Sequence, residues 1–286
     1  MDLVYLNGNY VPAETACIPV LDRGFMFGDG VYEVMPVYNG RVFRVDEHMQ
    51  RLQRSLQAVD IRCESCDSQM TDIFASLIEN NIQNGDGFIY LQITRGVMQV
   101  RDQAYDRDMK ATILVMCQPF NYFPQSRDTA GIRAITVDDN RWMDCHIKSI
   151  NLLPNVLLKQ QAIDAGAQEA ILIRDNQAIE GTSSNLFLVK GEVIYTPPKT
   201  RFMLGGITRE VILELCSENR ILVREMPITE DELHDADEIW MTSSTREIMP
   251  VTTLNQHKVG KGVPGPMWLQ LIELYQAFKQ SVMRGE

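Results

Sequence analysis

The sequence is poor in basic charge and contains no long apolar run. Its 286 residues carry 27 Lys and Arg against 38 Asp and Glu, and a net charge of −11 repels phosphate backbones and anionic lipids. No apolar stretch approaches the roughly 18 residues of a membrane span. Asp2 and Asn7 stand where a secretion signal needs a basic start followed by an apolar run. We therefore expect a cytoplasmic protein that binds neither nucleic acid nor membrane.

Metal and nucleotide signatures are also missing. Six cysteines are scattered without a disulfide framework, so free thiols are expected, and the CxxC at 63–66 lacks a second ligand pair among four dispersed histidines. Gly28-Asp-Gly30 lacks the third glycine of a dinucleotide loop, no P-loop exists, and 181–185 is not a nucleophile elbow. The sequence predicts no metal site and gives no support for hydride transfer or nucleotide hydrolysis.

Length and composition favour two domains of mixed α/β (α+β) class. With 45% hydrophobic and 23% charged residues, the chain has the composition of an ordinary globular protein. Residues 118–131 (QPFNYFPQSRDTAG) break all periodicity, as an interdomain connection does. We expect a smaller N-terminal α+β domain over 1–119, a linker over 120–131 and a larger C-terminal domain over 132–286.

Apolar periodicity defines the expected elements. Asn-Gly pairs at 7–8 and 39–40 lie between β-type runs and predict hairpins, and Asp46 is a candidate N-cap for an amphipathic helix over 46–59. Further helices are expected at 67–82, 153–165, 207–219 and 266–282, with a short one opened by the capping box Thr229-x-x-Glu232. Further strands are expected at 88–94, 111–117, 132–138, 169–174, 185–189, 192–195, 222–226 and 237–242.

Lys148 has an unusual setting for one of only eight lysines. In WMDCHIKSINLL it is flanked by apolar residues, and partial desolvation lowers a lysine's pKa and frees the amine to act as nucleophile or base. The alternative is a snorkelling or ion-paired lysine. Nearby Cys145 is expected to pack in the core.

Three later segments offer groups that suit a phosphorylated, ring-containing ligand. Glu180 precedes a glycine-and-hydroxyl turn in AIEGTSSNLFLV, where a carboxylate can hold a ring nitrogen protonated or be an ordinary turn acid. The glycines of 204–208 (LGGIT) lead into a helix and can form an anion cup or a plain helix start. The hydroxyls of 241–248 (MTSSTREI) end a buried strand and suit phosphate oxygens.

In order along the chain, these segments resemble the fold-type IV family of pyridoxal-phosphate-dependent enzymes. The matching stretches are DRGFMFGDGVYEV (22–34), HMQRL (48–52), YLQITRG (90–96), RWMDCHIKSINLL (141–153), AIEGTSSNLF (178–187), GGITR (205–209) and MTSSTREIMPV (241–251). The GDGVYE block and the IKSINLL context are most similar to the D-amino-acid aminotransferase branch. The resemblance implies the two-domain fold of that family and pyridoxal 5'-phosphate as cofactor.

The resemblance assigns a role to each matching residue. Lys148 would form the Schiff base with pyridoxal phosphate and then carry the proton at the substrate α-carbon, and Glu180 would pair with the ring nitrogen. Leu204 would pack on the ring. The phosphate would be held by Arg51, Ile207, Thr208, Ser243 and Ser244.

The substrate carboxylate is where the sequence departs from the family pattern. Tyr32 and Ser243 would face the substrate. D-amino-acid aminotransferases follow Thr-Arg-Gly with a short loop whose arginine and histidine bind the carboxylate across a dimer interface. Residues 95–108 here (RGVMQVRDQAYDRD) contain no histidine. Arg101 matches the arginine with one residue inserted, and its alternative is a solvated loop arginine.

The resemblance implies transamination between D-amino acids, of the alanine and glutamate type, and 2-oxo acids by a homodimer. Within the same cofactor class, the alternatives are a branched-chain L-amino-acid aminotransferase and an aminodeoxychorismate lyase. A non-catalytic protein that retains the fold is the alternative from a different class, and the presence of both Lys148 and Glu180 speaks against it.

Overall fold

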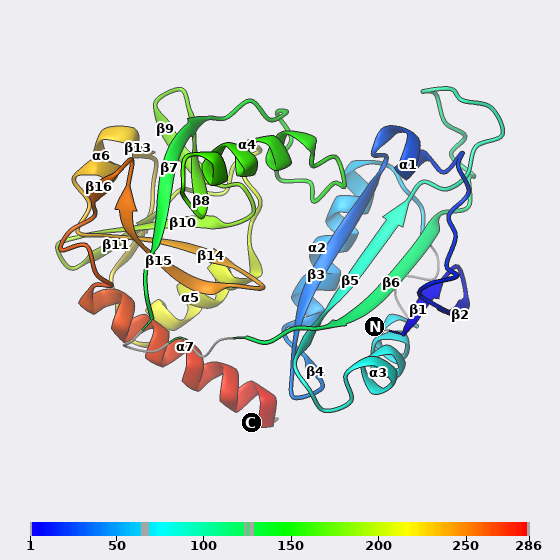
Figure 1. Cartoon of the computed structure of the whole chain (residues 1–286), viewed down its shortest axis with the longest axis horizontal. Coiled ribbons are helices and arrows are strands. Elements are labelled where there is room, and N and C mark those ends of the chain that lie inside the picture. Colours follow the sequence, from blue (N-terminus) through cyan, green and yellow to red (C-terminus); the bar gives the residue numbers. More distant parts are fainter. Residues whose placement is uncertain (1, 64–68, 123–124, 126–128, 285–286) are drawn as a thin grey trace. The chain divides into compact units, whose positions relative to one another are not determined.

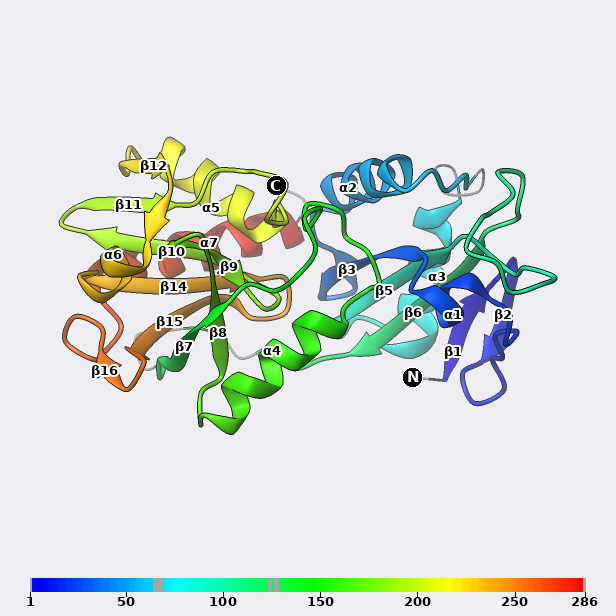
Figure 2. The same ribbon diagram turned by 90° about the horizontal axis from the view of Figure 1, so that it is seen from above.

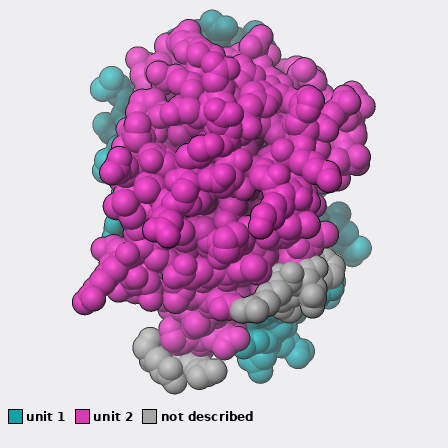
Figure 3. Space-filling model, turned by 90° about the vertical axis from the view of Figure 1, so that its left-hand side faces the viewer, with its two compact units in different colours: residues 1–122, 147–152 teal, residues 123–146, 153–286 magenta. Residues whose placement is uncertain are grey.

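A computed structural model describes residues 2–63, 69–122, 125 and 129–284 of the chain (Figure 1). The fold divides into two compact units, coloured separately in Figure 3. Unit 1 comprises residues 1–122 and 147–152, and unit 2 comprises residues 123–146 and 153–286. Within the described ranges, no helix combines the length and the apolar character needed to cross a lipid bilayer.

Unit 1 is a six-stranded antiparallel sheet with the order β2-β1-β6-β5-β3-β4. Its elements are β1 (Leu3–Leu6), β2 (Asn9–Pro12), α1 (Arg23–Phe27), β3 (Gly30–Tyr38), β4 (Arg41–Val42), α2 (Val45–Ala58), α3 (Met70–Asn81), β5 (Gly87–Thr94) and β6 (Thr112–Pro119). Helices α2 and α3 bury their apolar side chains against one face of the sheet, in a core that includes Leu52, Phe74 and Leu91.

The two predicted hairpins are confirmed. Asn7 and Gly8 between β1 and β2 have φ of 50° and 98°, and Asn39 and Gly40 between β3 and β4 have φ of 47° and 73°. Positive φ at both central residues is what a two-residue hairpin turn requires, and Asn-Gly adopts it at low cost. The predicted strands of unit 1 are likewise confirmed as β5 and β6.

The helix predicted at 46–59 is confirmed as α2, but Asp46 is not its N-cap. The cap is Arg44, which has φ of 54° and whose carbonyl accepts the N–H of His48 at 3.1 Å. The helix starts one residue earlier because the chain leaves β4 through this left-handed residue. Asp46 lies in the first turn instead, where its charge favours the helix dipole. Part of the helix expected at 67–82 lies outside the described residues, and the rest is α3.

Unit 2 is built on a ten-stranded mixed sheet with the order β12-β11-β10-β14-β15-β7-β8-β9-β13, and β16 pairs with β15. Its elements are β7 (Ile132–Asp138), α4 (Leu153–Asp164), β8 (Glu169–Arg174), β9 (Gln177–Gly181), β10 (Asn185–Lys190), β11 (Val193–Thr196), α5 (Ile207–Glu218), β12 (Val223–Glu225), β13 (Ile228–Thr229), α6 (Glu230–His234), β14 (Glu238–Ser243), β15 (Glu247–Leu254), β16 (His257–Lys258) and α7 (Pro266–Arg284). Helices α5 and α7 lie side by side and pack on β14 (Figures 1 and 2).

Most predicted elements of unit 2 are confirmed, including the capping box, in which Thr229 and Glu232 bond reciprocally at the start of α6. Four strands were not predicted: β9, β15 and the two-residue strands β13 and β16. The turn into β9 is Asp175-Asn176, with φ of 51° and 60°, so it lacks the glycine that signals a hairpin. In β15, Pro250 interrupts the apolar pattern, although the strand pairs with both β14 and β7.

The division into units differs from the expected one at the lysine segment. The boundary between residues 122 and 123 falls inside the expected linker, but residues 147–152 pack with unit 1 although we expected them in the second domain. Cys17, Cys117, Cys145 and Cys216 are free thiols, and Cys145 is buried as expected. Cys63 is disulfide-bonded, which contradicts the expected free thiol.

Candidate active site

Lys148 lies in unit 1, on a short segment beside β3. Its N–H donates to Oγ of Ser55 at 3.2 Å, and its carbonyl oxygen accepts the N–H of Tyr32 at 3.0 Å. The half-buried side chain places Nζ 4.3 Å from the centroid of the Tyr32 ring, a contact that ring electrostatics favour. Among the residues that the structure describes, no carboxylate pairs with this amine. Two predicted site residues, Lys148 and Tyr32, are therefore in contact.

A buried charged cluster joins α2 to β3. Glu33 accepts hydrogen bonds from Nε and Nη2 of Arg51 at 2.8 and 2.7 Å. Burial alone would raise the pKa of Glu33, but Arg51 and His48 outweigh it and hold this pKa well below its usual range. Burial would lower the pKa of Arg51, yet Glu33 raises it, so Arg51 stays a cation. Arg51, the residue predicted to bind the phosphate, is therefore held in one orientation by Glu33.

His48 completes this cluster as a neutral ring. Burial is the main cause that lowers its pKa, and the charges of Arg51 and Lys148 act in the same direction. Its Nδ1 lies 2.8 Å from the ionised Glu33, so Nδ1 carries the hydrogen. Its Nε2 is buried and has no hydrogen-bond partner among the described residues.

Glu180, on β9, is buried in unit 2 and accepts hydrogen bonds from three residues. Its Oε1 accepts Nη1 of Arg141 at 2.6 Å, and its Oε2 accepts the N–H of Leu204 at 3.2 Å and Nδ2 of Asn185 at 3.3 Å. Burial raises the pKa of Glu180 more than Arg141 lowers it, which leaves a pKa of about 7. A cationic ring nitrogen placed against this carboxylate would favour its ionised form.

This raised pKa has a consequence for stability. The usual pKa of the carboxyl is 4.5, so between about pH 4.5 and 7 the folded chain holds a proton at Glu180 that the unfolded chain has released. The stabilising contribution of that proton is complete below pH 4.5 and is lost as the pH rises through about 7.

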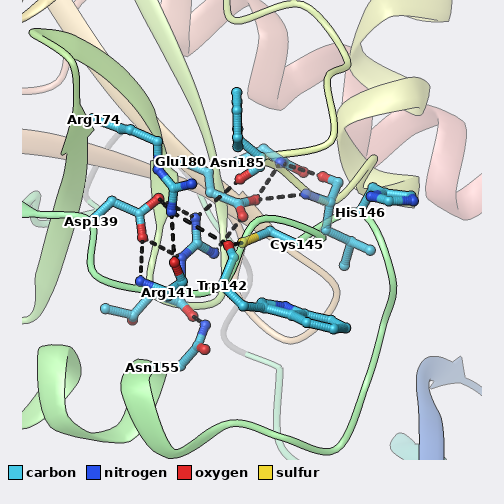
Figure 4. Close-up of polar contacts among 12 residues, drawn as sticks. Asp139, Arg141, Trp142, Cys145, His146, Asn155, Arg174, Glu180 and Asn185 are labelled. Carbon is cyan, nitrogen blue, oxygen red and sulfur yellow. Dashed lines mark hydrogen bonds and ion pairs between the residues drawn. The ribbon is translucent and has the colours of Figure 1, made fainter.

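Arg141 connects Glu180 to a second carboxylate (Figure 4). Its Nε and Nη2 donate to the two carboxylate oxygens of Asp139 at 2.9 and 3.0 Å, a bidentate pair. Burial would raise the pKa of Asp139, but Arg141 and Arg174 lower it, and Arg174 Nη2 lies 3.0 Å from the same carboxylate. The four side chains are neutral in sum when Glu180 is ionised.

The loop before α5 is anchored on the same cluster. Nη2 of Arg141 donates to the carbonyl oxygen of Phe202 at 3.2 Å, and Nδ2 of Asn185 donates to that of Leu204 at 2.7 Å. The first-turn N–H groups of a helix lack intrahelical partners, and Gly206, the N-cap of α5, has no side chain to bond them. A Cβ at Gly206 would lie 2.1 Å from Oδ1 of Asn185, so glycine is required there.

Ser243 and Ser244 stand at the end of β14, which neighbours β10 in the sheet. The adjacent Thr242 pairs with Asn185, and its buried Oγ1 has no hydrogen-bond partner among the described residues. Asn185 thus links Glu180, the approach to α5 and this hydroxyl-rich strand end. A carboxylate together with these donors fits a phosphorylated ring such as pyridoxal phosphate.

Arg101 is exposed in the loop between β5 and β6. Its guanidinium carbon lies 5.0 Å from the centroid of the Phe27 ring, and it forms no ion pair with a described residue. Arg107 of the same loop, by contrast, pairs with Asp60 at 3.3 Å. Within the described part of unit 1, no contact joins Arg101 to Tyr32, the other residue of this unit expected to face the substrate.

Sequence reasoning missed three of the residues that build these surroundings. Arg141 and Asn185 both lie in stretches that carry the family resemblance, so a signal was present, but an arginine's partner 39 residues away cannot be read from spacing. Ser55 lies three residues beyond HMQRL, and the sequence marks it only as a polar position in a predicted helix, which gives no indication of a role in the site.

Replacing Arg141 tests the origin of the Glu180 pKa. In Arg141→Met the carboxylate stays buried but loses its cation, so its pKa should rise by at least about one unit above 7. The measurement is a pH titration of ¹³C-labelled glutamate by NMR without added ligand, with Glu180→Gln assigning the signal. Arg174→Met, which removes a cation that contacts Asp139 but not Glu180, is the matched control and should shift the midpoint much less. An unchanged midpoint in Arg141→Met contradicts this account.

Comparisons with known proteins identify the family of the chain. A model of the family described as amino-transferase class IV matches residues 30–254. The chain is 42% identical to D-alanine aminotransferase from Bacillus licheniformis, over 92% of each chain. The branched-chain amino acid aminotransferase of Escherichia coli has a TM-score of 0.86 and 29% identity, over 98% of this chain and 94% of that one. Another branched-chain amino acid aminotransferase, from T.th. and complexed with N-(5'-phosphopyridoxyl)-L-glutamate, has a TM-score of 0.85 and 27% identity, over 96% and 92%. The chain therefore belongs to the class IV aminotransferases, the fold-type IV and pyridoxal-phosphate-dependent family that its motifs resemble.

Proposed function

We propose that the protein transfers amino groups between D-amino acids, of the alanine and glutamate type, and 2-oxo acids, with pyridoxal 5'-phosphate as cofactor. The observation that carries the cofactor assignment is the buried Glu180, whose partners in unit 2 are all hydrogen-bond donors. The name of the 42% identical relative supports the D-amino-acid substrate. When bound, pyridoxal phosphate accepts the electron pair left on the substrate α-carbon after proton removal.

Lys148 is the proposed base and covalent anchor. Its Nζ would hold the cofactor at the aldehyde carbon and, when free, would take the proton from the substrate α-carbon. Its position against the Tyr32 ring and the absence of a carboxylate partner among the described residues support this role. Glu180 would hold the ring nitrogen, since its ionised form is a hydrogen-bond acceptor at that atom.

The remaining roles follow the donor chemistry of each residue. Leu204 would pack on the ring. The phosphate would be held by Arg51, by the N–H groups of Ile207 and Thr208 with the threonine hydroxyl, and by Ser243 with Ser244. Tyr32, Ser243 and an Arg101 guanidinium supplied by the neighbouring subunit would orient the substrate carboxylate.

A branched-chain L-amino-acid aminotransferase is the second candidate, because the solved structures with TM-scores near 0.86 include enzymes of that name. The two activities differ in the hand of the substrate. Half-reactions followed by absorbance with D-alanine and with L-leucine separate them, and aminodeoxychorismate tests the lyase alternative. We expect D-alanine to react fastest. Loss of visible absorbance with L-leucine alone would favour the second candidate.

The exposed face of α4 supports a homodimer. Leu153, Val156 and Leu157 are 64%, 59% and 58% exposed, a concentration of large apolar side chains that marks an interaction surface on a soluble fold. A second copy is the proposed occupant because isologous pairs are the commonest closed assembly. The cytoplasmic location expected from the sequence stays a prediction.

Removing the lysine amine tests the proposed chemistry. Lys148→Ala should lose the visible absorbance of the loaded protein and lower D-alanine turnover by roughly a thousand-fold or more, because the covalent anchor and the base are the same group. Borohydride reduction of the wild type, followed by peptide mass analysis, should place the cofactor on Lys148. Lys258→Ala, at an exposed lysine of β16, is the control. Wild-type turnover by Lys148→Ala would refute the assignment.

Arg101→Ala tests carboxylate binding. It should lower kcat/KM for D-alanine by roughly 2 to 4 kcal/mol, the loss expected for a desolvated charge pair, and leave the cofactor spectrum intact. Use of (R)-1-phenylethylamine, which has no carboxylate, should not change. Arg107→Ala removes the neighbouring arginine that Asp60 already pairs and serves as control. An unchanged D-alanine rate means that another group binds the carboxylate.

Leu157→Asp tests the dimer. A carboxylate in the apolar face of α4 should shift sedimentation at micromolar concentration towards monomer and lower activity in parallel, since the family resemblance implies a pocket built partly by the neighbour. Val263→Asp makes the same change at a side chain that is 60% exposed but lies outside α4, and should leave the dimer intact. A fully active wild-type monomer would contradict the proposal.

A further inference from the structure

The peptide groups around Lys148 are fixed to the edge of the unit 1 sheet. Ser149 forms an isolated antiparallel bridge with Val31, and the N–H of Ile150 donates to the carbonyl oxygen of Gly30 at 3.0 Å. Strand β4 pairs only with Val37 and Tyr38 at the far end of β3. The lysine segment therefore adds a short antiparallel stretch along the part of β3 that β4 leaves unpaired.

Beyond this edge, one contact to Lys148 comes from a helix. The N–H of Lys148 donates to Oγ of Ser55, a side chain only 3% exposed, across 93 residues of sequence. Serine is a weak helix former whose hydroxyl competes for backbone groups, and burying it is costly without a partner. Among the described residues, the hydroxyl of Ser55 forms one hydrogen bond, which it accepts from the N–H of Lys148. A serine at this position of α2 is thus explained by the lysine rather than by the helix.

The helix face that carries Ser55 is anchored to the sheet. It shares one face of α2 with His48 and Arg51, because spacings of three, four and seven residues point the same way on a helix. His48 and Arg51 both bond to Glu33 of β3 within the buried cluster. The same helix face that orients Arg51 therefore offers a fixed oxygen to the Lys148 N–H.

Apart from its bonds to β3, the segment has no regular secondary structure to restrain it. The chain enters unit 1 at Ile147 and leaves it at Leu152, and neither a helix nor a named strand covers these six residues. A peptide group freed from its partner regains conformational freedom. An amine that must meet one carbon atom tolerates displacements of only about 1 Å before its rate suffers.

We propose that Ser55 is a positioning residue for Lys148, and that its hydroxyl fixes the Lys148 peptide so that the amine stays against the Tyr32 ring. The proposal rests on the proposed function for its catalytic consequence. Ser55 touches only the backbone of Lys148, not the reacting atoms, so its effect is expected on placement of the amine and not on the chemistry of the amine itself.

Hydrogen exchange in the cofactor-free protein tests the contact directly. Protein labelled with ¹⁵N-lysine gives one backbone amide signal for each of the eight lysines, so seven serve as internal references. In Ser55→Ala the Lys148 amide should exchange at least tenfold faster, with the other seven changed less than twofold. Ser76→Ala is the matched control, because Ser76 lies on α3, which packs on β1 and β6. It should leave all eight signals unchanged.

Turnover in the loaded enzyme tests the consequence. Ser55→Ala should lower kcat with D-alanine ten- to a hundredfold and change KM less than threefold, whereas Ser76→Ala should match the wild type. The proposal is overturned by an unchanged Lys148 exchange rate, by equal acceleration of all eight amides, or by faster exchange with unchanged kcat. Failure of the proposed function is distinguishable, because it would appear as full turnover by Lys148→Ala whatever the exchange rates of Ser55→Ala.

Discussion

The ion pair between Arg141 and Glu180 is the interaction on which the candidate site of unit 2 depends. A carboxyl group as deeply buried as Glu180 would stay protonated without a nearby cation. The protonated acid carries an O–H donor on one oxygen, so only the ionised form can accept a hydrogen bond from a ring nitrogen at either oxygen. Arg141 brings the pKa down only to about 7, so the ionised state remains responsive to a further positive charge. Asp139 in turn balances Arg141, which lets the guanidinium remain buried without forcing full ionisation of Glu180.

In unit 1, a buried ion pair joins a helix to a strand. Glu33 is strongly ionised because Arg51 and His48 both face it, and the resulting pair fixes α2 to β3. The helix then presents Arg51 and the hydroxyl of Ser55 from a single face, and the second of these reaches the backbone of Lys148. A buried ion pair is weak evidence for stability, but it can fix the position of one element on another. A fixed position of α2 on β3 is what the Lys148 amine requires, because it must reach one target atom.

Local patterns predicted much of this fold because local chemistry determines it. The Asn-Gly turns, the capping box of α6 and the apolar faces of α2 and α5 all depend on residues within one turn or hairpin. The errors arise where distant partners decide. Pro250 is tolerated in β15 because β14 and β7 flank that strand, and residues 147–152 join unit 1 because β3 leaves an edge unpaired. The motifs named Lys148 and Glu180, but Arg141, Asn185 and Ser55 act through contacts over 39, 5 and 93 residues that no period encodes.

Asn185 ties together the two parts of unit 2 that are proposed to hold the ring nitrogen and the phosphate of the cofactor. Its Nδ2 bonds both to Glu180 and to the carbonyl oxygen of Leu204, and the N–H of Leu204 returns to Glu180. Gly206 then passes so close to Oδ1 of Asn185 that a methyl group would not fit. The start of α5 is consequently placed relative to Glu180 by a short chain of covalent and hydrogen bonds, with no flexible loop between them. Because a phosphorylated ring has a fixed length, a site that binds both its nitrogen and its phosphate needs this separation to be constant, and the Asn185 amide together with the obligatory glycine keeps it so.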